Sequence, residues 1–225
     1  MIWQDQGFLL SIYRYNENSA ITEFFTLNHG KITGVIFGAT SKKIKNYLLI
    51  GNNFHLNYNS KNDGKIGYFK IEINKINTPI FLDNQKKLFC IIFALNLIKI
   101  LTVDNQSNKN IYNSINDLFS LISVNDWLVN FIFWELNLYK NIGYDINFKN
   151  YVKNINLDGK DKFVVESTNK IIPNFLINNE KNPVYKDILD GFKIVGDFLD
   201  KTILKPNNIN YPLSRNEFIK LLKWI

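Results

Sequence analysis

The stretch TEFFTLNHGKITGVIFGATSKK, from Thr22 to Lys43, decides the fold of the first part of this chain. Two apolar runs rich in aromatic and β-branched residues flank a tight Asn28-His29-Gly30 corner, a pattern that predicts a β-hairpin. Gly30 is expected to supply the positive φ that such a corner needs, and Gly34 or Gly38 to permit strong curvature or a bulge. The second run ends in a loop that carries Lys42, Lys43 and Lys45. The segment therefore predicts a hairpin with a basic exit.

The residues on either side of this hairpin continue the same pattern. Short apolar runs, several with period-two alternation, are separated by turn signals that include Asp63-Gly64. They predict five strands, at residues 7–15, 20–27, 31–37, 54–58 and 66–73. Five short strands are too few for a sandwich and favour a small closed barrel of the oligonucleotide/oligosaccharide-binding (OB) kind. A distorted SH3-like barrel is the alternative.

Beyond Thr78-Pro79 the apolar spacing becomes helical. Helices are predicted at residues 84–101, 110–122, 126–142, 183–203 and 216–225. Residues 143–180 are polar and turn-rich, with a possible hairpin at 156–166. The prediction is an α+β chain of two domains: an all-β OB barrel at 1–78 that binds DNA, and an all-α domain at 79–225 that binds partners, with an irregular insert at about 143–180.

Composition limits the classes of function. The formal net charge is +7, and the first 78 residues are the more basic part, which makes a polyanionic partner plausible. The beginning of the chain does not have the pattern of a secretion signal. The most apolar run, 88–101, is too short to span a bilayer and predicts a buried helix. Cys90 is the only cysteine, which is typical of a reducing cytosol, so we expect a cytoplasmic protein without disulfides.

The sequence carries no recognisable catalytic constellation. It lacks a phosphate-binding Gly-x-x-x-x-Gly-Lys motif and a Gly-x-Ser-x-Gly elbow, and its two histidines, His29 and His55, have no metal-ligand partner at regular spacing. We therefore expect a protein without catalytic residues, metal or cofactor. A metal-dependent nuclease that uses scattered carboxylates remains the alternative, and an adaptor that binds only protein is a third possibility.

Binding of nucleic acid fits the first 78 residues better. Single strands are bound by basic side chains interleaved with aromatic ones, because phosphates attract positive charge and bases stack on aromatic faces. Alternation on the third strand places Ile32 and Ile36 in the barrel and directs Lys31 and Phe37 outward. The predicted DNA-binding residues are Arg14, His29, Lys31, Phe37, Lys42, Lys43 and Lys45. Solvated lysines and buried aromatic rings are the alternative interpretation.

Three blocks of the sequence resemble one known family. The first comprises Glu17, Asn18-Ser19, Ile21, Phe25-Thr26, His29-Gly30-Lys31, Gly34-Val35, Gly38-Ala39 and Ser41-Lys42-Lys43. The second is FWELNLYKNIGYDINF at 133–148, and the third is LKPNNINYPLSRNEF at 204–218, where Arg215 matches the family's arginine. Together and in this order the blocks are similar to the bacterial DNA repair protein RecO family.

The resemblance implies an OB barrel followed by a helical domain and a role without turnover. It implies binding of single- and double-stranded DNA, annealing of complementary strands, and action with RecR in loading RecA onto DNA coated by single-strand-binding protein (SSB). It also implies a site for the acidic, aromatic-tipped SSB tail on the helical domain. Spacing on the matching helix predicts that Phe133, Leu136 and Tyr139 form its apolar slot and Lys140 its cation. Buried helix packing is the alternative for these residues.

The chain departs from the family at three places. The family usually has a basic residue where Phe37 stands, and often another where Thr40 stands. The cysteine cluster that can hold zinc in many members is absent after Gly143-Tyr144-Asp145. An arginine near the SSB-tail site of some members is replaced here by Ile132 and Phe133. These departures predict less positive charge in the loop after the third strand, no zinc site and weaker binding of the SSB tail.

Overall fold

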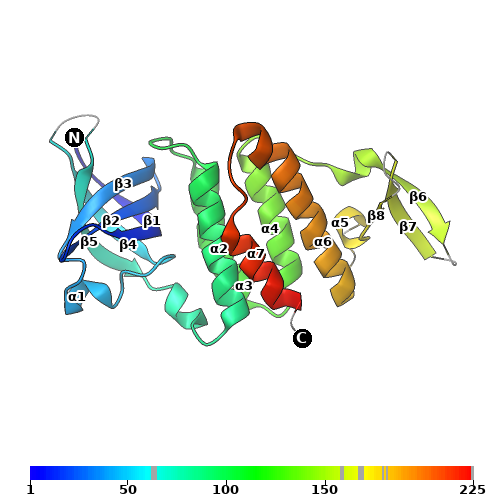
Figure 1. Cartoon of the computed structure of the whole chain (residues 1–225), viewed down its shortest axis with the longest axis horizontal. Coiled ribbons are helices and arrows are strands. Elements are labelled where there is room, and N and C mark those ends of the chain that lie inside the picture. The colour runs from blue at the N-terminus through cyan, green and yellow to red at the C-terminus, as the bar shows by residue number, and fades with distance from the viewer. Residues whose placement is uncertain (62–64, 158–159, 167–169, 179, 181, 224–225) are drawn as a thin grey trace. The chain divides into compact units, whose positions relative to one another are not determined.

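The computed structural model describes the chain except for residues 62–64, 158–159, 167–169, 179, 181 and 224–225. Its first five strands are β1 (Ile2–Arg14), β2 (Ser19–Thr26), β3 (Gly30–Phe37), β4 (Asn53–Asn59) and β5 (Gly67–Lys75). They close into a barrel in the order β1-β2-β3-β5-β4 (Figure 1). β3 and β5 pair in parallel and all the other neighbours are antiparallel. This is the five-stranded Greek-key barrel of the OB kind that the sequence predicted.

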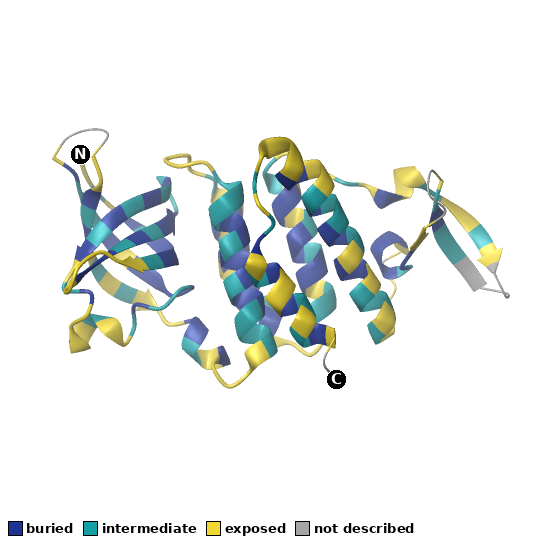
Figure 2. Ribbon diagram, in the orientation of Figure 1, coloured by how far each residue is buried: buried dark blue, intermediate teal, exposed yellow. Residues whose placement is uncertain are grey.

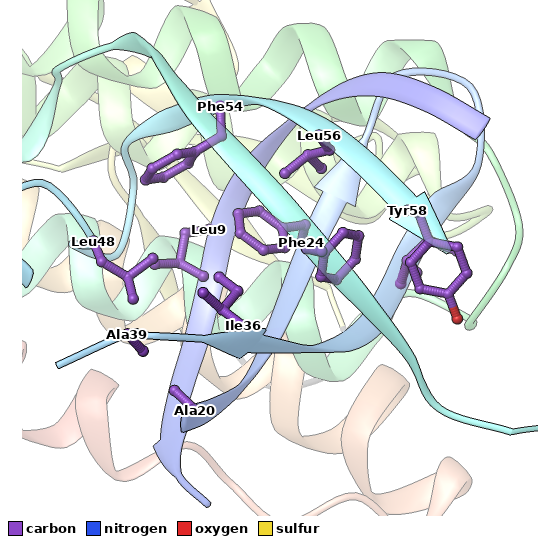
Figure 3. Close-up of a cluster of buried hydrophobic side chains, with 11 residues drawn as sticks. Leu9, Ala20, Phe24, Ile36, Ala39, Leu48, Phe54, Leu56 and Tyr58 are labelled. Carbon is purple, nitrogen blue, oxygen red and sulfur yellow. The ribbon is translucent and has the colours of Figure 1, made fainter. Parts of the chain in front are cut away.

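Alternating apolar residues fill the barrel (Figure 3). Ile32 and Ile36 point inward, as predicted, and so do Phe54, Leu56 and Tyr58 of β4. The whole buried cluster comprises Leu9, Ala20, Phe24, Ile32, Ile36, Ala39, Leu48, Phe54, Leu56, Tyr58 and Phe69. Because side chains alternate along a strand, Lys31, Thr33, Val35 and Phe37 of β3 face outward.

β1 begins five residues earlier than predicted and closes the barrel. Its first half pairs with β4 and its second half with β2, and the register shifts between Leu9 and Ser11. On the opposite side Gly34 pairs with Gly67. A Cβ atom on Gly34 would lie 2.4 Å from the Phe69 ring, so the closure leaves no room for a side chain there. The curvature predicted from Gly34 therefore has a packing cause.

Helices cover part of the outer surface of the barrel. α2 (Gln85–Leu101) has its buried residues between Cys90 and Ile98, and it packs against β1 and against α7 (Leu213–Lys223). Phe8 of β1 contacts Tyr112 of α3 (Lys109–Ser123), with ring centroids 5.1 Å apart. The 3₁₀ turn η1 (Thr78–Phe81) leads from β5 to α2, and the short α1 (Lys42–Lys45) lies in the loop after β3. The sequence predicted α1 only as a loop.

The chain forms two compact units, and their boundary does not coincide with the change of periodicity at Thr78-Pro79. The first unit contains Met1–Phe119 and α7, and the second contains Ser120–Tyr211. The predicted helices 84–101 and 216–225, and most of the predicted helix 110–122, therefore belong with the barrel. The division into functional domains at residue 78 stays a prediction.

The second unit contains α4 (Trp127–Asn141) packed against α6 (Tyr185–Phe198). α6 continues into a π-helical turn, η3 (Leu199–Leu204), and then η4 (Lys205–Asn207), where the sequence predicted one helix to residue 203. The region 143–180 holds η2 (Phe148–Tyr151), the strands β6 (Val152–Leu157), β7 (Lys160–Val165) and β8 (Ile171–Ile172), and α5 (Phe175–Asn178). β6 and β7 form the predicted hairpin, whose turn at 158–159 lies outside the described residues.

Within the described part of the chain, no helix has the length and apolarity needed to cross a membrane. Buried residues lie in the barrel interior and along the inner faces of the helices (Figure 2). α1, by contrast, is exposed along most of its length (Figure 2).

Candidate nucleic-acid interface

Three lysines of α1 form an exposed basic cluster at one end of the barrel. Ile44 packs against the barrel core and anchors the short helix, so Lys42, Lys43 and Lys45 extend into solvent. The loop before them turns at Gly38, which has φ of +73° and accepts a hydrogen bond from the Ser41 N–H. Among the described residues, no ion pair engages these three ammonium groups. They are available to phosphates.

The loop between β1 and β2 is bonded to the loop that leads into α1. The Ala39 N–H donates to the Asn18 carbonyl oxygen at 3.1 Å, and Thr40 Oγ1 donates to Asn18 Oδ1 at 2.9 Å. These contacts place the end of β1 beside the lysine cluster. Arg14 is exposed there, and its Nε donates to the Asn16 carbonyl oxygen at 3.3 Å.

Phe37 lies at the same end and faces solvent. Its side chain is 62% exposed, and its ring centroid is 5.9 Å from that of Tyr68 on β5. Its position opposite Ser19, at the start of β2, sets it beside the loop that carries Asn18. The structure therefore brings Arg14, Phe37 and the α1 lysines to one end of the barrel, where charge and an aromatic face lie together.

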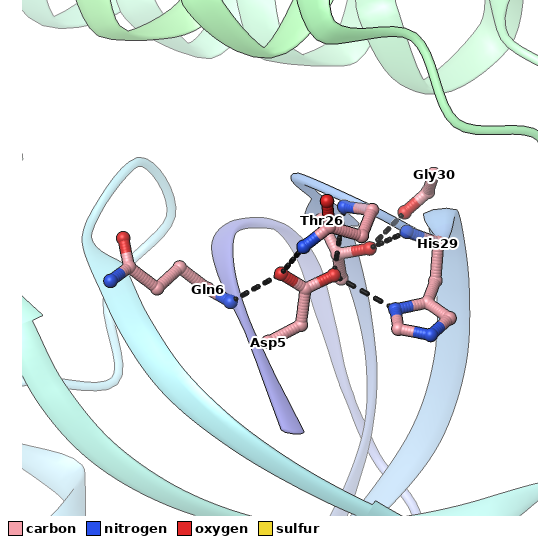
Figure 4. Close-up of polar contacts among 6 residues, drawn as sticks. Asp5, Gln6, Thr26, His29 and Gly30 are labelled. Atoms are coloured by element: carbon pink, nitrogen blue, oxygen red, sulfur yellow. Dashed lines mark hydrogen bonds and ion pairs between the residues drawn. The ribbon is translucent and has the colours of Figure 1, made fainter. Parts of the chain in front are cut away.

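His29 lies at the other end of β3, and Asp5 fixes its position (Figure 4). The buried Asp5 carboxylate accepts from the Asn28 N–H and lies 2.8 Å from His29 Nδ1. Thr26 Oγ1 accepts from the His29 N–H at 3.0 Å and donates to the Gly30 carbonyl oxygen. Gly30 has the predicted positive φ, +72°, and a Cβ atom there would meet the Gln106 carbonyl. The Asn-His-Gly corner is thus held by one carboxylate and one hydroxyl.

Lys31 points outward, as the alternation predicted, but its ammonium is bound within the molecule. Nζ donates to the carbonyl oxygens of Lys99 and Thr102, each at 2.7 Å, at the C-terminal end of α2. It also lies 3.1 Å from Asp104 Oδ1. Its side chain is only 12% exposed. Lys31 and Phe37 share a face of β3 but are six residues apart, about 20 Å at 3.3 Å per residue.

The predicted DNA-binding residues therefore separate into two groups. Arg14, Phe37 and the three α1 lysines lie at one end of β3, whereas His29 and Lys31 lie at the other. The sequence did not identify Asp5, because an isolated aspartate among Trp3, Gln4 and Gln6 carries no signal of burial.

The predicted SSB-tail residues of α4 have different environments. Phe133 and Leu136 are half-buried, and the Phe133 ring contacts the Phe175 ring edge to face, with centroids 6.1 Å apart. Lys140 is exposed, and its Nζ lies 3.2 Å from Asp145 Oδ2.

Tyr139 is fully buried, its hydroxyl donates to Glu135 Oε1 at 2.9 Å, and its ring contacts Phe198. Tyr139 is a core residue and cannot line an exposed slot, so that part of the prediction is corrected.

Arg215, which matches the family's arginine, is a buried residue. Arg215 is 1% exposed, and its guanidinium lies 5.0 Å from the centroid of the Phe93 ring, which indicates a packing role in the first unit.

In the part of the chain that the structure describes, no three His, Cys, Asp or Glu side chains are grouped so that they could hold a metal ion. The expectation of a metal-free protein stays a prediction.

The fold and its basic end define a class: an OB-barrel protein with a helical extension. Comparison with known families is more specific. The family described as "Recombination protein O N terminal" matches residues 1–76, and "Recombination protein O C terminal" matches residues 83–167. The chain belongs to the recombination protein O (RecO) family.

Curated relatives agree with this assignment along almost the whole chain. The DNA repair protein RecO of Ehrlichia chaffeensis is 26% identical over 99% of this chain and 98% of its own length. That of Rhodopseudomonas palustris is 23% identical over 99% of this chain and 96% of its own. The DNA repair protein RecO of a Ruegeria species is 28% identical over 65% of this chain and 61% of its own.

Proposed function

We propose that this chain is a recombination mediator that binds single- and double-stranded DNA, anneals complementary strands and turns over no substrate. The observation that supports this best is the group of Arg14, Phe37 and the α1 lysines at one end of an OB barrel. OB folds bind oligonucleotides with the face of their second and third strands and with the adjoining loops. Here the exposed end of β3 and the loop between β1 and β2 lie in that position.

The chemistry of this end predicts how DNA is bound. Ammonium groups on exposed lysines contact phosphates, which carry no sequence information, so binding is tolerant of sequence. Each neutralised phosphate releases counterions, so affinity falls steeply as salt rises. Phe37 adds a stacking face for an unpaired base, which favours single strands.

Partner binding completes the proposed function. Membership of the RecO family and the resemblance described above support action with RecR in loading RecA onto DNA coated by SSB. On α4, Phe133, Leu136 and Lys140 offer two half-buried apolar side chains and an exposed cation at spacings of three and four residues. That arrangement suits the SSB tail, which needs an apolar slot and a positive charge.

An annealing assay with complementary strands coated by SSB tests the proposal. The full-length protein is expected to accelerate duplex formation and to retain labelled single- and double-stranded oligonucleotides at low salt. For either oligonucleotide, the logarithm of the binding constant is expected to fall linearly with the logarithm of the salt concentration. A protein that binds DNA but leaves the annealing rate of coated strands unchanged is not a mediator.

The same materials distinguish the other classes of function. Incubation of labelled DNA with the protein and Mg²⁺ or Mn²⁺ is expected to leave the strands intact, whereas shortened products would assign a nuclease. Absence of any bound DNA at low salt would favour an adaptor that binds only protein.

A further inference from the structure

A pocket of about 680 Å³ opens at the end of the barrel that holds His29. Its lining comes from the start of β1, the corner between β2 and β3, the end of β4, the residues just before β5, and the loop that follows α2. The residues that matter for its chemistry are Trp3, His29, Thr33, Tyr58, Lys65 and Ile66. Pockets for small ligands are typically about 300–1,000 Å³, so this one is large enough for a nucleotide.

Three stacked aromatic rings form one wall of the pocket. The Trp3 and His29 rings are nearly parallel, at 10° with centroids 4.0 Å apart, and Trp3 also stacks on Tyr58 at 4.8 Å. Other contacts hold the outer rings in place, since Asp5 orients His29 and the Tyr58 hydroxyl accepts from the Gly67 N–H at 3.1 Å. The His29 side chain remains 34% exposed. A rigid, partly open aromatic wall of this kind suits a planar ring.

The rim carries a cation and an apolar side chain. Lys65 is exposed, and among the described residues no ion pair engages its ammonium. Lys31 also lines the pocket, but its charge is taken up by Asp104 and two carbonyl oxygens. Ile66 is 61% exposed beside Lys65. The pocket therefore offers an available positive charge, that of Lys65, next to apolar and aromatic surface, which matches a base with its phosphate.

The outer face of β3 connects this pocket to the lysine-rich end. Phe37, Val35 and Thr33 lie on that face by alternation, and Thr33 lines the pocket. Val35 pairs with Tyr68, whose ring contacts Phe37. A strand held by the α1 lysines and Phe37 can follow this face for about 20 Å and reach the pocket.

We propose that the pocket receives one unstacked nucleotide of a bound single strand, with its base at the exposed His29 end of the aromatic wall and its phosphate at Lys65. This inference rests on the proposed DNA-binding function and adds a defined site for one base to it. The ligand chemistry is that of a nucleotide, which a DNA strand or a free nucleotide could supply, and the strand is the source that the β3 face favours.

The test uses the full-length protein and a thymidine oligonucleotide that carries 2-aminopurine, whose fluorescence is quenched when it stacks. Anisotropy of an end label reports binding of the same strand independently. Ile66→Glu places a negative charge at the exposed rim without disturbing the core. His29→Asn removes the ring while its amide can still donate to Asp5. Both variants are expected to bind about tenfold more weakly and to lose the quenching, because His29→Asn removes a stacking contact and Ile66→Glu repels the phosphate at Lys65.

Ile80→Glu is the matched control, since Ile80 is 74% exposed on η1 and does not line the pocket. It is expected to behave as the wild type does. Equal affinity and quenching in all four proteins would overturn the pocket while leaving DNA binding intact. No anisotropy change with any protein would overturn the proposed function and this inference with it. Recovery of the 2-aminopurine fluorescence on adding deoxyadenosine monophosphate, with the strand still bound, would assign the pocket to free nucleotides and overturn the strand as its source.

Discussion

The ammonium of Lys31 lies 2.7 Å from the main-chain carbonyl oxygen of Lys99, and the ammonium of Lys99 is turned back toward the barrel. Lys99 Nζ lies 2.6 Å from Glu23 Oε2 and donates to the Tyr13 hydroxyl at 2.7 Å. Lys31 thus links β3 to the end of α2, and Lys99 links α2 to β1 and β2. A cation is stabilising at a helix C-terminus, where carbonyl groups are unpaired and the dipole is negative. We therefore expect Lys31 to serve packing between elements rather than contact with DNA.

Replacing Lys31 with Met separates these two roles. The change leaves two carbonyl oxygens of α2 without their donor, and we expect the free energy of unfolding to fall by about 1–3 kcal/mol. The salt slope of DNA binding should not change, because the ammonium does not reach a phosphate. Denaturant unfolding and salt titrations measure the two effects. Lys70→Met, an exposed lysine on β5, is the control, and a flatter slope in Lys31→Met alone would return Lys31 to the DNA interface.

The ion pair of Lys99 is predicted to make the free energy of unfolding depend on pH in the alkaline range. Burial alone lowers its pKa, but the hydrogen bonds and charges of Glu23 and Tyr13 outweigh this, so the pKa is raised above the ordinary 10.5. A raised pKa in the folded state means that the stabilisation is complete below the unfolded pKa and is lost as pH rises through the folded one. The difference in free energy of unfolding between wild type and Lys99→Met should be constant near neutrality and shrink above about pH 10.5. A difference that does not change over this range would show that the ion pair contributes nothing.

The three α1 lysines are predicted to dominate the electrostatics of DNA binding. Replacing Lys42, Lys43 and Lys45 with Ala should weaken binding of every sequence and reduce the log–log salt slope on single strands by about 2, since each phosphate contact contributes about 0.7. The control replaces Lys149, Lys193 and Lys201, which are exposed in the second unit and change the net charge equally. Identical slopes in the two triple variants would mean that the α1 lysines are only solvated charge.

Local patterns predicted most of the elements, because alternation and helical spacing report burial directly. Ile32, Ile36 and Phe54 alternate as the barrel requires, and the buried run 88–101 forms most of α2.

Local pattern cannot report contacts between residues that are far apart in the sequence. Asp5 holds a corner more than twenty residues away, Lys31 reaches the end of α2, and α7 packs beside α2 from the far end of the chain. Tyr139 was misplaced because a helical stripe of apolar residues does not distinguish a core face from a docking face.

Phe37 is predicted to contribute stacking rather than stability. Its side chain is 62% exposed, so Phe37→Ala should leave the thermal transition almost unchanged. Loss of one base stack should weaken binding of single strands by about 1–3 kcal/mol, with less effect on duplexes, whose bases are already stacked. Tyr151→Ala removes an equally exposed ring in the second unit and serves as the control. A lower melting temperature with unchanged affinity would instead make Phe37 part of the fold.

The last prediction concerns the SSB tail. Phe133, Leu136 and Lys140 lie on one face of α4, and the exposed ion pair between Lys140 and Asp145 is too weak to withhold the ammonium from another carboxylate. A lysine provides a point charge where an arginine would bind a carboxylate in a bidentate manner. Binding of the tail should therefore be only micromolar and sensitive to salt.

Titration of a labelled tail peptide against the full-length protein measures this directly. Removal of the peptide's terminal Phe should abolish saturable binding, because the apolar slot loses its occupant. Leu136→Ala should weaken binding by shrinking the slot, and Lys140→Glu should weaken it by repelling the acidic peptide, most strongly at low salt. Lys201→Glu reverses another exposed charge outside α4 and should have no effect. If the peptide binds equally well to Leu136→Ala, Lys140→Glu and the wild type, this face of α4 is not the tail site.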